Sequence, residues 1–410
     1  GFEYVPIAEE VPRPISERQA KEKQARWRAS PPASLAEAAR RFAEQARLAI
    51  ESLTYRRAVH AYLLANARSF RKYNWDLLVS DFHNPTGALV ANKAGLRCLC
   101  LATALPESDR RIPPLWTDLA ADNRLESLVR VFLEWQKQDA LSLANRLRPD
   151  NVVWAATRRF YHITDHDLVE SFAVPPLRVV ESRELTFNLP TLIACPRAFD
   201  FDHPRRGNEH HVEPLVDLAR QEIDFDWGAL RPDRRLVYAS MGTQSWLMRR
   251  PARFFQTLID AFAGEPDAQL LLNVGAYFDP APLRPAPNVT IVRAAPQLAV
   301  LARAALMITH GGLNSVKECI MHGVPMVVFP VELDQPGNAA RVRHHGLGLS
   351  ADYTKARAAD VRAMCREVAT NPSFSLAVRR MRNEFVRAQD SGVSAEIVEH
   401  VLSRPPPACP

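Results

Sequence analysis

Short apolar runs alternate with stretches of helical spacing through the first quarter of the chain. Residues 16–72 place apolar side chains among Ala, Arg and Glu at the spacing of a helix. Asp76–Asp81 is an apolar run that ends in a polar residue, which is typical of a buried parallel strand that meets an active-site loop. The pattern then predicts a helix over Gly87–Lys93 and a second strand over Arg97–Leu101. This order of elements favours a doubly wound parallel sheet.

The middle of the chain contains a predicted helical segment rich in aromatic residues, a short strand and a polar, irregular segment. Residues 105–180 are predicted to be mostly helical, and they carry many aromatic side chains, namely Trp116, Phe132, Trp135, Trp154 and Tyr161. Thr191–Cys195 is predicted to be a further short strand. From Pro214 to Asp233 the sequence is polar and irregular, which predicts a linker between two domains.

After the linker the alternation restarts. The predicted strands are Leu236–Ala239, Gln269–Val274, Val289–Val292, Leu306–Thr309 and Met326–Pro330, and the predicted helices are Pro251–Phe262, Leu298–Ala304 and Asn314–Met321. Two such halves predict an α/β protein with two Rossmann-like doubly wound domains that face each other across a cleft. We expect a first domain over residues 1–214, a linker over 215–233, a second domain over 234–390 and a tail over 391–410. A helix around Ser394–Leu402 is expected to cross back to the first domain.

Composition narrows the class of protein. The 410 residues are 47% hydrophobic and 24% charged, as in ordinary globular domains, and no apolar run is long enough to span a bilayer. The net charge is +6, but the arginines are spread along the whole chain, so nucleic acid is not an expected partner while anionic substrates are compatible. The six cysteines form no CxxC pair and no secretory signal is visible, which predicts a reduced, cytoplasmic setting.

The strongest chemical signal lies at Ile308–Ser315 (ITHGGLNS). A strand ends at Thr309, Gly311 and Gly312 make a turn, and a helix is predicted to begin near Asn314. The unpaired N–H groups of a helix N-terminus suit a diphosphate. Asn314 and Ser315 can donate hydrogen bonds to its oxygens, and His310 can do so as the diphosphate leaves. The alternative interpretation is a tight turn in which Asn314 is the helix N-cap and His310 is an ordinary loop histidine.

Two further polar groups follow at suggestive places. Glu318 lies three and four residues beyond Ser315 and Asn314, on the same helical face, where a carboxylate can accept two hydrogen bonds from a ribose diol. Asp334 and Gln335 follow a strand and suit the hydroxyls of a hexose. The alternatives are a solvated helix charge for Glu318 and an ordinary loop for Asp334–Asn338.

These residues together resemble the signature region of the UDP-glycosyltransferase family. The resemblance rests on Pro296-Gln297, Thr309–Ser315, Glu318, Gly323–Pro325 and Asp334-Gln335, and Val237–Thr243 (VYASMGT) is similar to the first strand and loop of the family's C-terminal domain. Bacterial carotenoid (zeaxanthin) glucosyltransferases look closest. The resemblance implies the GT-B fold and an inverting glycosyltransferase. It covers residues 236–350 strongly and 74–104 more weakly.

The resemblance also implies a role for each matching position. Thr243, His310, Asn314 and Ser315, on the turn of Gly311 and Gly312, would hold the diphosphate. Glu318 would hold the ribose, Asp334 and Gln335 the transferred sugar, and Gln297 with the backbone of Ala295 the base. Many members of the family have a tryptophan at the position of Ala294, so both UDP-sugars and dTDP-sugars remain candidate donors. No metal and no other cofactor are expected.

The catalytic base of the family is a histidine after the first N-terminal strand, oriented by an aspartate. Asp81 matches that aspartate, although an aspartate at a strand end can also be purely structural. The first residues, Gly1–Ile7 (GFEYVPI), suggest a strand entered without a lead-in. We therefore expect the base histidine to lie upstream of Gly1, and the activity of the chain without it to be low or absent.

Three acidic triplets and one segment with two histidines could suggest metal ligands, but their patterns do not favour a metal site. The triplets Asp165/Asp167, Asp200/Asp202 and Asp224/Asp226 do not directly follow an apolar run, so a metal–nucleotide role is not expected for them. In Glu209–Glu213 (EHHVE) the adjacent histidines of an extended segment point to opposite faces.

The sequence therefore predicts an inverting transferase that moves a hexose from a UDP-sugar or dTDP-sugar to a hydroxyl of a lipophilic or aromatic small molecule. If that acceptor is a lipid, the protein is expected to lie peripherally at a membrane. Two alternatives remain: a catalytically silent partner protein that binds sugar nucleotides, and a GT-B-fold epimerase of sugar nucleotides.

Overall fold

The computed structural model describes residues 73–405 except for 83–84, 106–109, 120, 122–123, 147–188, 205–206, 244 and 246–247, together with Ser34, Glu37 and Ala67. The strand expected at Gly1–Ile7, the helices expected over residues 16–72, and Trp154 and Tyr161 lie outside the described residues. Within the part that is described, no helix is long and apolar enough to cross a membrane.

The first half of the described chain forms a parallel four-stranded sheet in the order β1-β2-β3-β4. Its strands are β1 (Leu77–Asp81), β2 (Arg97–Ala102), β3 (Thr191–Ile193) and β4 (Glu209–His211), with helices α3 (Pro85–Ala94) and α4 (Leu125–Arg146) between them in the chain. β1, α3, β2 and β3 fall where the apolar pattern predicts them. β4 is an additional strand, and only its pairing with β3 reveals it, because its sequence is polar.

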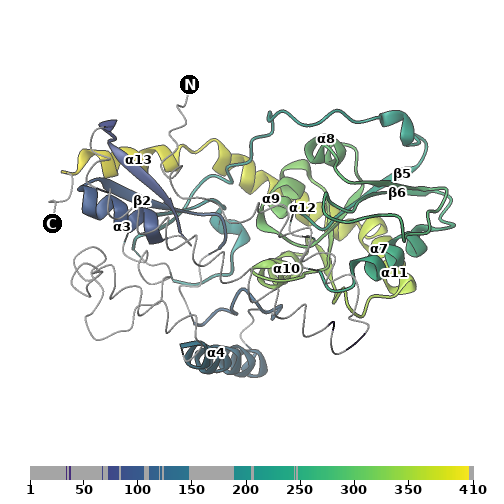
Figure 1. Ribbon diagram of the computed structural model, residues 1–410, viewed down its shortest axis with the longest axis horizontal. Helices are drawn as coiled ribbons and strands as arrows, with labels where there is room; N and C mark the ends of the chain where they lie inside the picture. Colours follow the sequence, from purple (N-terminus) through teal and green to yellow (C-terminus); the bar gives the residue numbers. More distant parts are fainter. Residues whose placement is uncertain are drawn as a thin grey trace.

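A parallel six-stranded sheet follows, in the order β10-β9-β8-β5-β6-β7. Its strands are β5 (Arg235–Ser240), β6 (Ala268–Asn273), β7 (Val289–Val292), β8 (Leu306–Thr309), β9 (Met326–Val328) and β10 (Gly348–Ser350). The helices are α7 (Pro251–Phe262), α8 (Gln297–Leu301), α9 (Leu313–His322), α10 (Gln335–His344), α11 (Ala358–Thr370), α12 (Pro372–Gln389) and α13 (Val393–Ser403). The two parallel sheets with their helices confirm the α/β class (Figure 1).

The alternation of side chains along β5 divides the core of the second sheet into two clusters. Val237 and Ala239 face one cluster, which α7 and α11 complete, while Leu236 and Tyr238 face the other, which α9 and α12 complete. The second cluster also contains Ile193 and Phe199 from the first half of the chain. The two sheets therefore share buried apolar surface.

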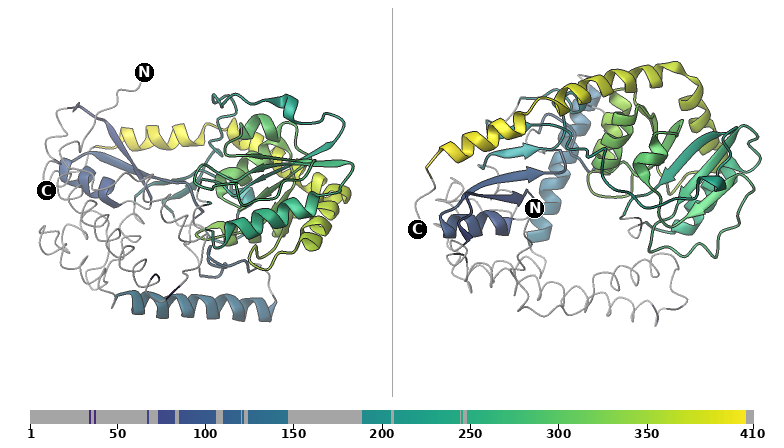
Figure 2. Two further views of the ribbon diagram at one scale, coloured as in Figure 1. Left: turned by 45° about the vertical axis from the view of Figure 1, so that its right-hand side comes forward. Right: turned by 90° about the horizontal axis from the view of Figure 1, so that it is seen from above.

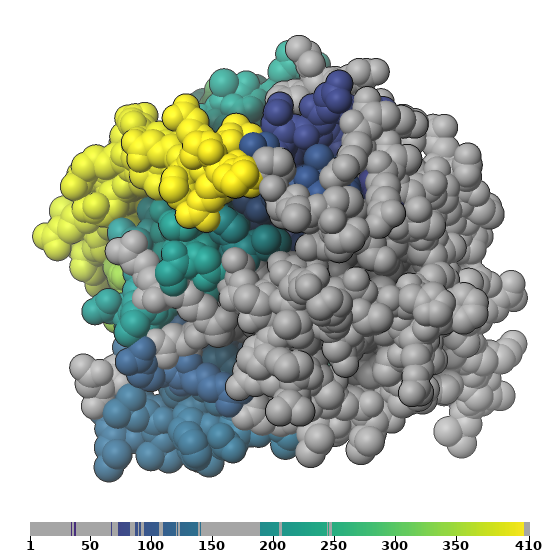
Figure 3. All heavy atoms as spheres, turned by 90° about the vertical axis from the view of Figure 1, so that its left-hand side faces the viewer, coloured from purple at the N-terminus to yellow at the C-terminus, as the bar shows by residue number. Residues whose placement is uncertain are grey.

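The end of the chain returns to the first sheet. Apolar residues of α13 pack against Leu99, Leu192 and Val212, and the contributing residues are Val393, Ile397 and Val398. The Nε of Arg97 donates a hydrogen bond to the Arg404 carbonyl at 2.7 Å. Figures 2 and 3 show α13, in yellow, lying against the purple and teal elements of the first sheet.

Candidate functional site

The strand order of the second sheet places a switch point between β5 and β8. From β5 the chain winds outward through β6 and β7, and from β8 it winds in the opposite direction through β9 and β10. In open parallel sheets, ligands bind beyond the carboxyl ends of strands at such a point. Thr243 lies on the loop after β5, where it is exposed, and His310 directly follows β8. The structure thus places these two predicted residues beyond the carboxyl ends of two neighbouring, hydrogen-bonded strands.

His310 is held between two glycines. A Cβ atom added to Gly242 would lie 2.4 Å from the His310 Cε1, and one added to Gly312 would lie 2.5 Å from the His310 Nε2. Burial lowers the pKa of His310 to about 4, although a hydrogen bond with the backbone of Ser240 acts in the opposite direction. The imidazole is therefore neutral at neutral pH, and its single N–H is the group that hydrogen-bonds the Ser240 carbonyl.

The turn before α9 leaves the first N–H groups of that helix available. Gly311 has φ 84°, and a Cβ there would lie 2.7 Å from the Val328 Cγ1, so the turn requires glycine. The N-cap of α9 is Gly312, which provides no capping side chain. The interpretation of Asn314 as the N-cap is therefore wrong, because Asn314 lies inside the first turn with its side chain exposed. An uncapped helix N-terminus is an anion-binding arrangement.

Glu318 is 5% exposed and both of its oxygens are engaged. Oε1 accepts a hydrogen bond from Arg220 at 2.5 Å, and Oε2 accepts one from the Gln297 Nε2 at 2.7 Å. The same Gln297 nitrogen lies 3.4 Å from the Ser315 Oγ. The structure thus joins three predicted residues into one network and rules out the interpretation of Glu318 as a solvated helix charge.

Arg220 is a member of this network that the sequence analysis misses. It comes from the segment before η4 (Trp227–Ala229), about one hundred residues away from Glu318 along the chain. Its neighbour Glu222 accepts the backbone N–H groups of Leu298 at 3.0 Å and Ala299 at 2.9 Å, and so caps α8. Linker charges carry no pattern in sequence, so only the fold could locate Arg220. Of the residues predicted for the base, Gln297 begins α8 and Ala295 is half-buried just before it.

Asp334 and Gln335 lie at the start of a helix, so the interpretation of Asp334–Asn338 as a loop is wrong. Asp334 is the N-cap of α10, and a proline in the first turn helps to begin the helix. The Gln335 Oε1 accepts hydrogen bonds from Val331 N at 2.8 Å and Glu332 N at 3.1 Å, which leaves its amide NH₂ as the group that can turn to a ligand.

Leu333 and Asn338, close to Asp334, also favour a functional site at the start of α10. Leu333 has φ 64° and is 58% exposed, and a leucine in the left-handed region is strained backbone of a kind that gathers at functional sites. Asn338 is fully buried, and its Nδ2 donates to the Gly311 carbonyl and to the Asp334 Oδ2, both at 2.9 Å. Asn338 therefore links the turn after β8 to the start of α10.

Asp81 ends β1 at the carboxyl edge of the first sheet, where its side chain is exposed. The base histidine that it is expected to orient lies outside the described residues. The role of Asp81 stays a prediction.

Buried cations connect the second sheet to the first half of the chain. The Lys317 Nζ, on α9, donates to the carbonyls of Ala194 at 2.8 Å and Pro214 at 2.7 Å, and burial lowers the pKa of this lysine. Arg341, on α10, is fully buried and pairs with Asp200 at 2.7 Å. Both helices that begin at the candidate site are thereby fixed to the segment that leads out of the first sheet.

Two aspartates of the acidic triplets noted in the sequence, Asp200 and Asp226, have partners within the described structure. Asp200 meets His203 at 3.1 Å besides Arg341. Burial by itself raises the pKa of Asp200. The combined effect of Arg341 and His203 is larger and lowers this pKa below its ordinary value, so the carboxyl stays ionised. Asp226 accepts the Gly228 N–H at the start of η4. No group of three or more ligating side chains suited to a metal occurs among the described residues.

Comparison with known proteins shows similarity to glycosyltransferases. Residues 198–383 match the family described as "UDP-glucoronosyl and UDP-glucosyl transferase". The chain is 28% identical over 347 residues to a zeaxanthin glucosyltransferase of Pantoea ananas, an alignment that covers 82% of this chain and 74% of that protein.

Solved structures share the fold. The crystal structure of the glycotransferase of kitacinnamycin superposes with a TM-score of 0.62 at 22% identity, over 84% of this chain and 82% of that one. The glycosyltransferase VinC in complex with DTDP superposes with a TM-score of 0.57 at 18% identity, over 86% and 81%. The protein therefore has the GT-B fold, and its residues 198–383 are similar to the family described as "UDP-glucoronosyl and UDP-glucosyl transferase".

Proposed function

We propose that this protein is an inverting glycosyltransferase that moves a hexose from a UDP-sugar or dTDP-sugar to a hydroxyl group of a lipophilic or aromatic small molecule. The observation that carries the proposal is the uncapped N-terminus of α9 beside the neutral His310, at the switch point between β5 and β8. This arrangement suits a leaving diphosphate, because fixed N–H dipoles stabilise developing negative charge without a metal ion.

In this proposal each donor group meets one part of the site. The diphosphate lies against α9, within reach of Thr243, His310, Asn314 and Ser315. The ribose meets Glu318, and the base lies by Gln297 and Ala295. The hexose hydroxyls meet Asp334 and the amide NH₂ of Gln335. The exposed Ala294 offers no ring for the base to stack on, so the proposal includes both uridine and thymidine donors.

The chemical step is one displacement at the anomeric carbon. The acceptor oxygen bonds to that carbon from one side while the bond to the diphosphate oxygen breaks on the other, which inverts the configuration. A base takes the proton of the acceptor hydroxyl, and we assign that role to the histidine that Asp81 would orient. The diphosphate leaves with the bonding electrons, stabilised by the α9 N-terminus. The bound anion favours the protonated His310 ring, whose second N–H can then donate to the diphosphate.

The acceptor class is supported by α4. Leu125, Leu128, Val129, Phe132 and Leu133 follow helical spacing and are between 45% and 78% exposed, so they form one apolar stripe. The Trp135 Nε1 of the same helix donates to the Ile112 carbonyl at 3.0 Å, and Leu115, close by in the chain, touches Gly337 at the start of α10. An apolar acceptor near α4 would thus lie close to the proposed hexose site. The zeaxanthin glucosyltransferase relative is compatible with such an acceptor.

The test is to incubate the protein with UDP-glucose, or with dTDP-glucose, and hydroxylated lipophilic compounds, and to measure nucleotide diphosphate release with and without the acceptor. We expect release that depends on the acceptor. His310→Ala should reduce turnover about a hundredfold or more, which is the usual effect of losing a group that stabilises a leaving or developing charge. Asp334→Ala should also reduce turnover, because the hexose loses the carboxylate that accepts hydrogen bonds from its hydroxyls. Asp233→Asn, in the exposed linker, is the matched control.

Two outcomes would contradict the proposal. Nucleotide binding without release in any mixture would favour the silent partner protein. Turnover that is unchanged in both the His310 and the Asp334 variants would refute the assignment of the donor site.

A further inference from the structure

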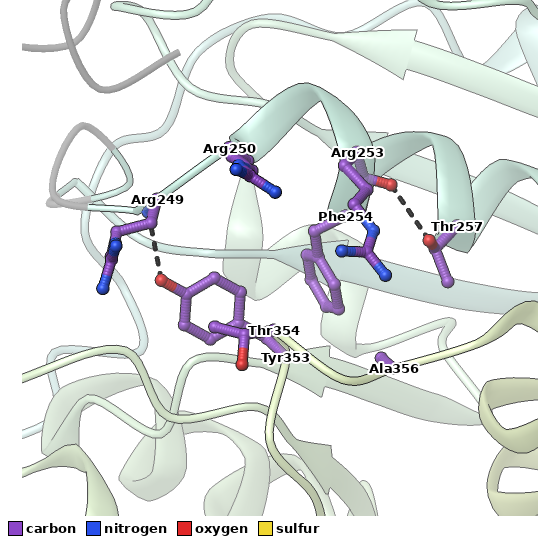
Figure 4. Close-up of a pocket in the computed structure, with 8 residues that line it drawn as sticks. All are labelled: Arg249, Arg250, Arg253, Phe254, Thr257, Tyr353, Thr354 and Ala356. Atoms are coloured by element: carbon purple, nitrogen blue, oxygen red, sulfur yellow. Dashed lines mark hydrogen bonds between the residues drawn. The ribbon is translucent and has the colours of Figure 1, made fainter. Parts of the chain in front are cut away.

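Three arginines gather around a cavity on the other side of the second sheet from α9. Arg249, Arg250 and Arg253 line a cavity of about 310 Å³ together with Phe254, Thr257, Tyr353, Thr354 and Ala356 (Figure 4). Phe254 and Tyr353 belong to the core cluster on the α7 and α11 face, whereas α9 packs into the opposite cluster. The cavity is therefore separate from the candidate donor site.

The charges in this cavity are not compensated by the described protein. All three arginines are exposed, and none forms an ion pair or a side-chain hydrogen bond with another described residue. Asp352, which precedes the lining residue Tyr353 in the chain, already accepts the backbone N–H of Thr354 at 2.8 Å and pairs with Lys355 at 3.5 Å.

The position of the arginines is electrostatically unfavourable for a bare protein. Arg250 is the N-cap of α7, Arg253 lies in its first turn, and no acidic residue is present there. A helix N-terminus carries partial positive charge, so cations at this end are destabilising and anions are favoured. Arg250 also has φ 53°, a left-handed conformation that is strained for arginine. An anion in the cavity would offset the repulsion among the three guanidinium groups.

The rest of the lining indicates what kind of anion fits. The Tyr353 hydroxyl accepts the Arg249 backbone N–H at 3.0 Å, which leaves its own hydrogen free to donate to a ligand. The rings of Phe254 and Tyr353 are 5.8 Å apart and form an apolar base. Guanidinium groups and a hydroxyl above aromatic rings suit a phosphate group that is attached to an organic body.

We propose that this cavity binds the phosphate group of an organic phosphate, either a free metabolite or a phospholipid head group, independently of the donor site. Arg250 and Arg253 contact the phosphate oxygens, with the N-terminus of α7 behind them.

The test uses the whole protein with its donor site saturated by UDP, so that the donor site does not contribute to the signal. Inorganic phosphate binding is measured by calorimetry for the unaltered protein, for Arg250→Gln/Arg253→Gln, and for the matched control Arg379→Gln/Arg380→Gln on the exposed face of α12. We expect equal affinity in the unaltered protein and the control. The Arg250/Arg253 variant should bind phosphate at least about tenfold more weakly, because charge-assisted hydrogen bonds to phosphate are lost. Equal affinity in all three proteins would overturn the proposal.

A second arm separates the two sources of phosphate. Co-sedimentation with phosphatidylcholine vesicles containing phosphatidic acid should require Arg250 and Arg253 if the ligand is a lipid head group. Phosphate binding without vesicle binding identifies a free metabolite. Failure to bind either phosphate or vesicles refutes the site, and this result is independent of whether UDP binds or sugar is transferred. Because the substituted side chains are exposed, the variants are expected to fold, and a thermal unfolding midpoint equal to that of the control verifies it.

Discussion

Glu318 shows how one residue type acquires its role from its neighbours. A carboxylate on a helix is usually solvated, but this one is buried and hydrogen-bonded by Arg220 and Gln297. A buried carboxylate needs such partners, because an unpaired buried charge is costly. Arg220 therefore fixes the orientation of the Glu318 carboxylate at the place proposed for the ribose. We regard Arg220 as a positioning residue for the donor.

Replacing Arg220 with methionine should weaken donor binding. The Glu318 carboxylate would lose its charge-assisted partner, and we expect the KM for the sugar nucleotide to rise about tenfold, corresponding to roughly 1.5 kcal/mol. kcat should change much less, because the ribose is remote from the reacting carbon. Steady-state kinetics measures both constants.

Arg231→Met is the control for this substitution, since Arg231 lies in the same linker and pairs with the exposed Asp233. Arg220→Lys should give an intermediate KM. A KM for Arg220→Met that equals that of the control would show that Glu318 does not depend on Arg220.

At the scale of elements, the starts of α9 and α10 create the site and the rest of each helix anchors it. α9 begins without a capping side chain and α10 begins at Asp334, while Lys317 and Arg341 farther along fix both helices to the first half of the chain. The start of α10 is also in close contact with that half. Gly337 N donates to the Leu115 carbonyl at 2.6 Å, so the two backbones touch.

Gly337→Ala should disturb this contact. The new Cβ would lie 2.6 Å from the Leu115 Cα and 2.7 Å from its carbonyl oxygen, and backbone atoms cannot yield as a flexible side chain does. We expect a loss of about 1–3 kcal/mol in the free energy of unfolding, as for other overpacked sites, and a raised KM for the donor because Gln335 moves. Urea unfolding and donor kinetics check the two effects.

The matched control is Gly207→Ala, because a Cβ at Gly207 would meet nothing within 4 Å. Equal stability of the two variants would contradict the close approach of Leu115 and Gly337.

For the whole molecule, the joining of the two sheets depends on groups that are buried and polar. Besides Lys317 and the Asp200–Arg341 pair, several histidines are enclosed. Burial lowers the pKa of His211, His310 and His345 below the ordinary value of 6.5. These histidines are neutral in the folded protein at neutral pH and accept protons more readily once it unfolds.

The protein should therefore lose stability in mild acid. Below about pH 6.5 the unfolded chain binds more protons than the folded one, so the free energy of unfolding falls as the pH drops from 6.5 towards the pKa of about 4 of His310, and it is level above this window. At about pH 5 His310 alone should account for about 2 kcal/mol. Urea unfolding at about pH 7.5 and 5 measures the difference. His310→Gln should reduce that difference by the same amount, and an unchanged difference would show that His310 is not buried in its neutral form.

Much of the order of the elements was readable in the sequence because it depends on local pattern. Apolar runs of strand length and helical spacing depend on neighbouring residues, so β1, β2, α7, β8 and α9 could be located from them. The Gly311-Gly312 turn, next to a histidine, likewise indicates from local sequence a place where the backbone can approach a ligand closely. β4 and β10 were not predicted, because polar or very short strands are defined by the strands they pair with. α10 was not predicted, because the sequence at its start resembles a loop.

The sequence by itself determined the α/β class, the position of the Gly311-Gly312 turn and the family resemblance, because each follows from residues close together in the chain. Only the tertiary structure decided that Arg220 meets Glu318, that Asn338 joins the two helix starts, and that Asp200 pairs with Arg341. It also decided that three arginines share one cavity with Tyr353. The physical reason is that desolvation and charge pairing depend on distances between segments about one hundred residues apart, and local pattern carries no information on those distances.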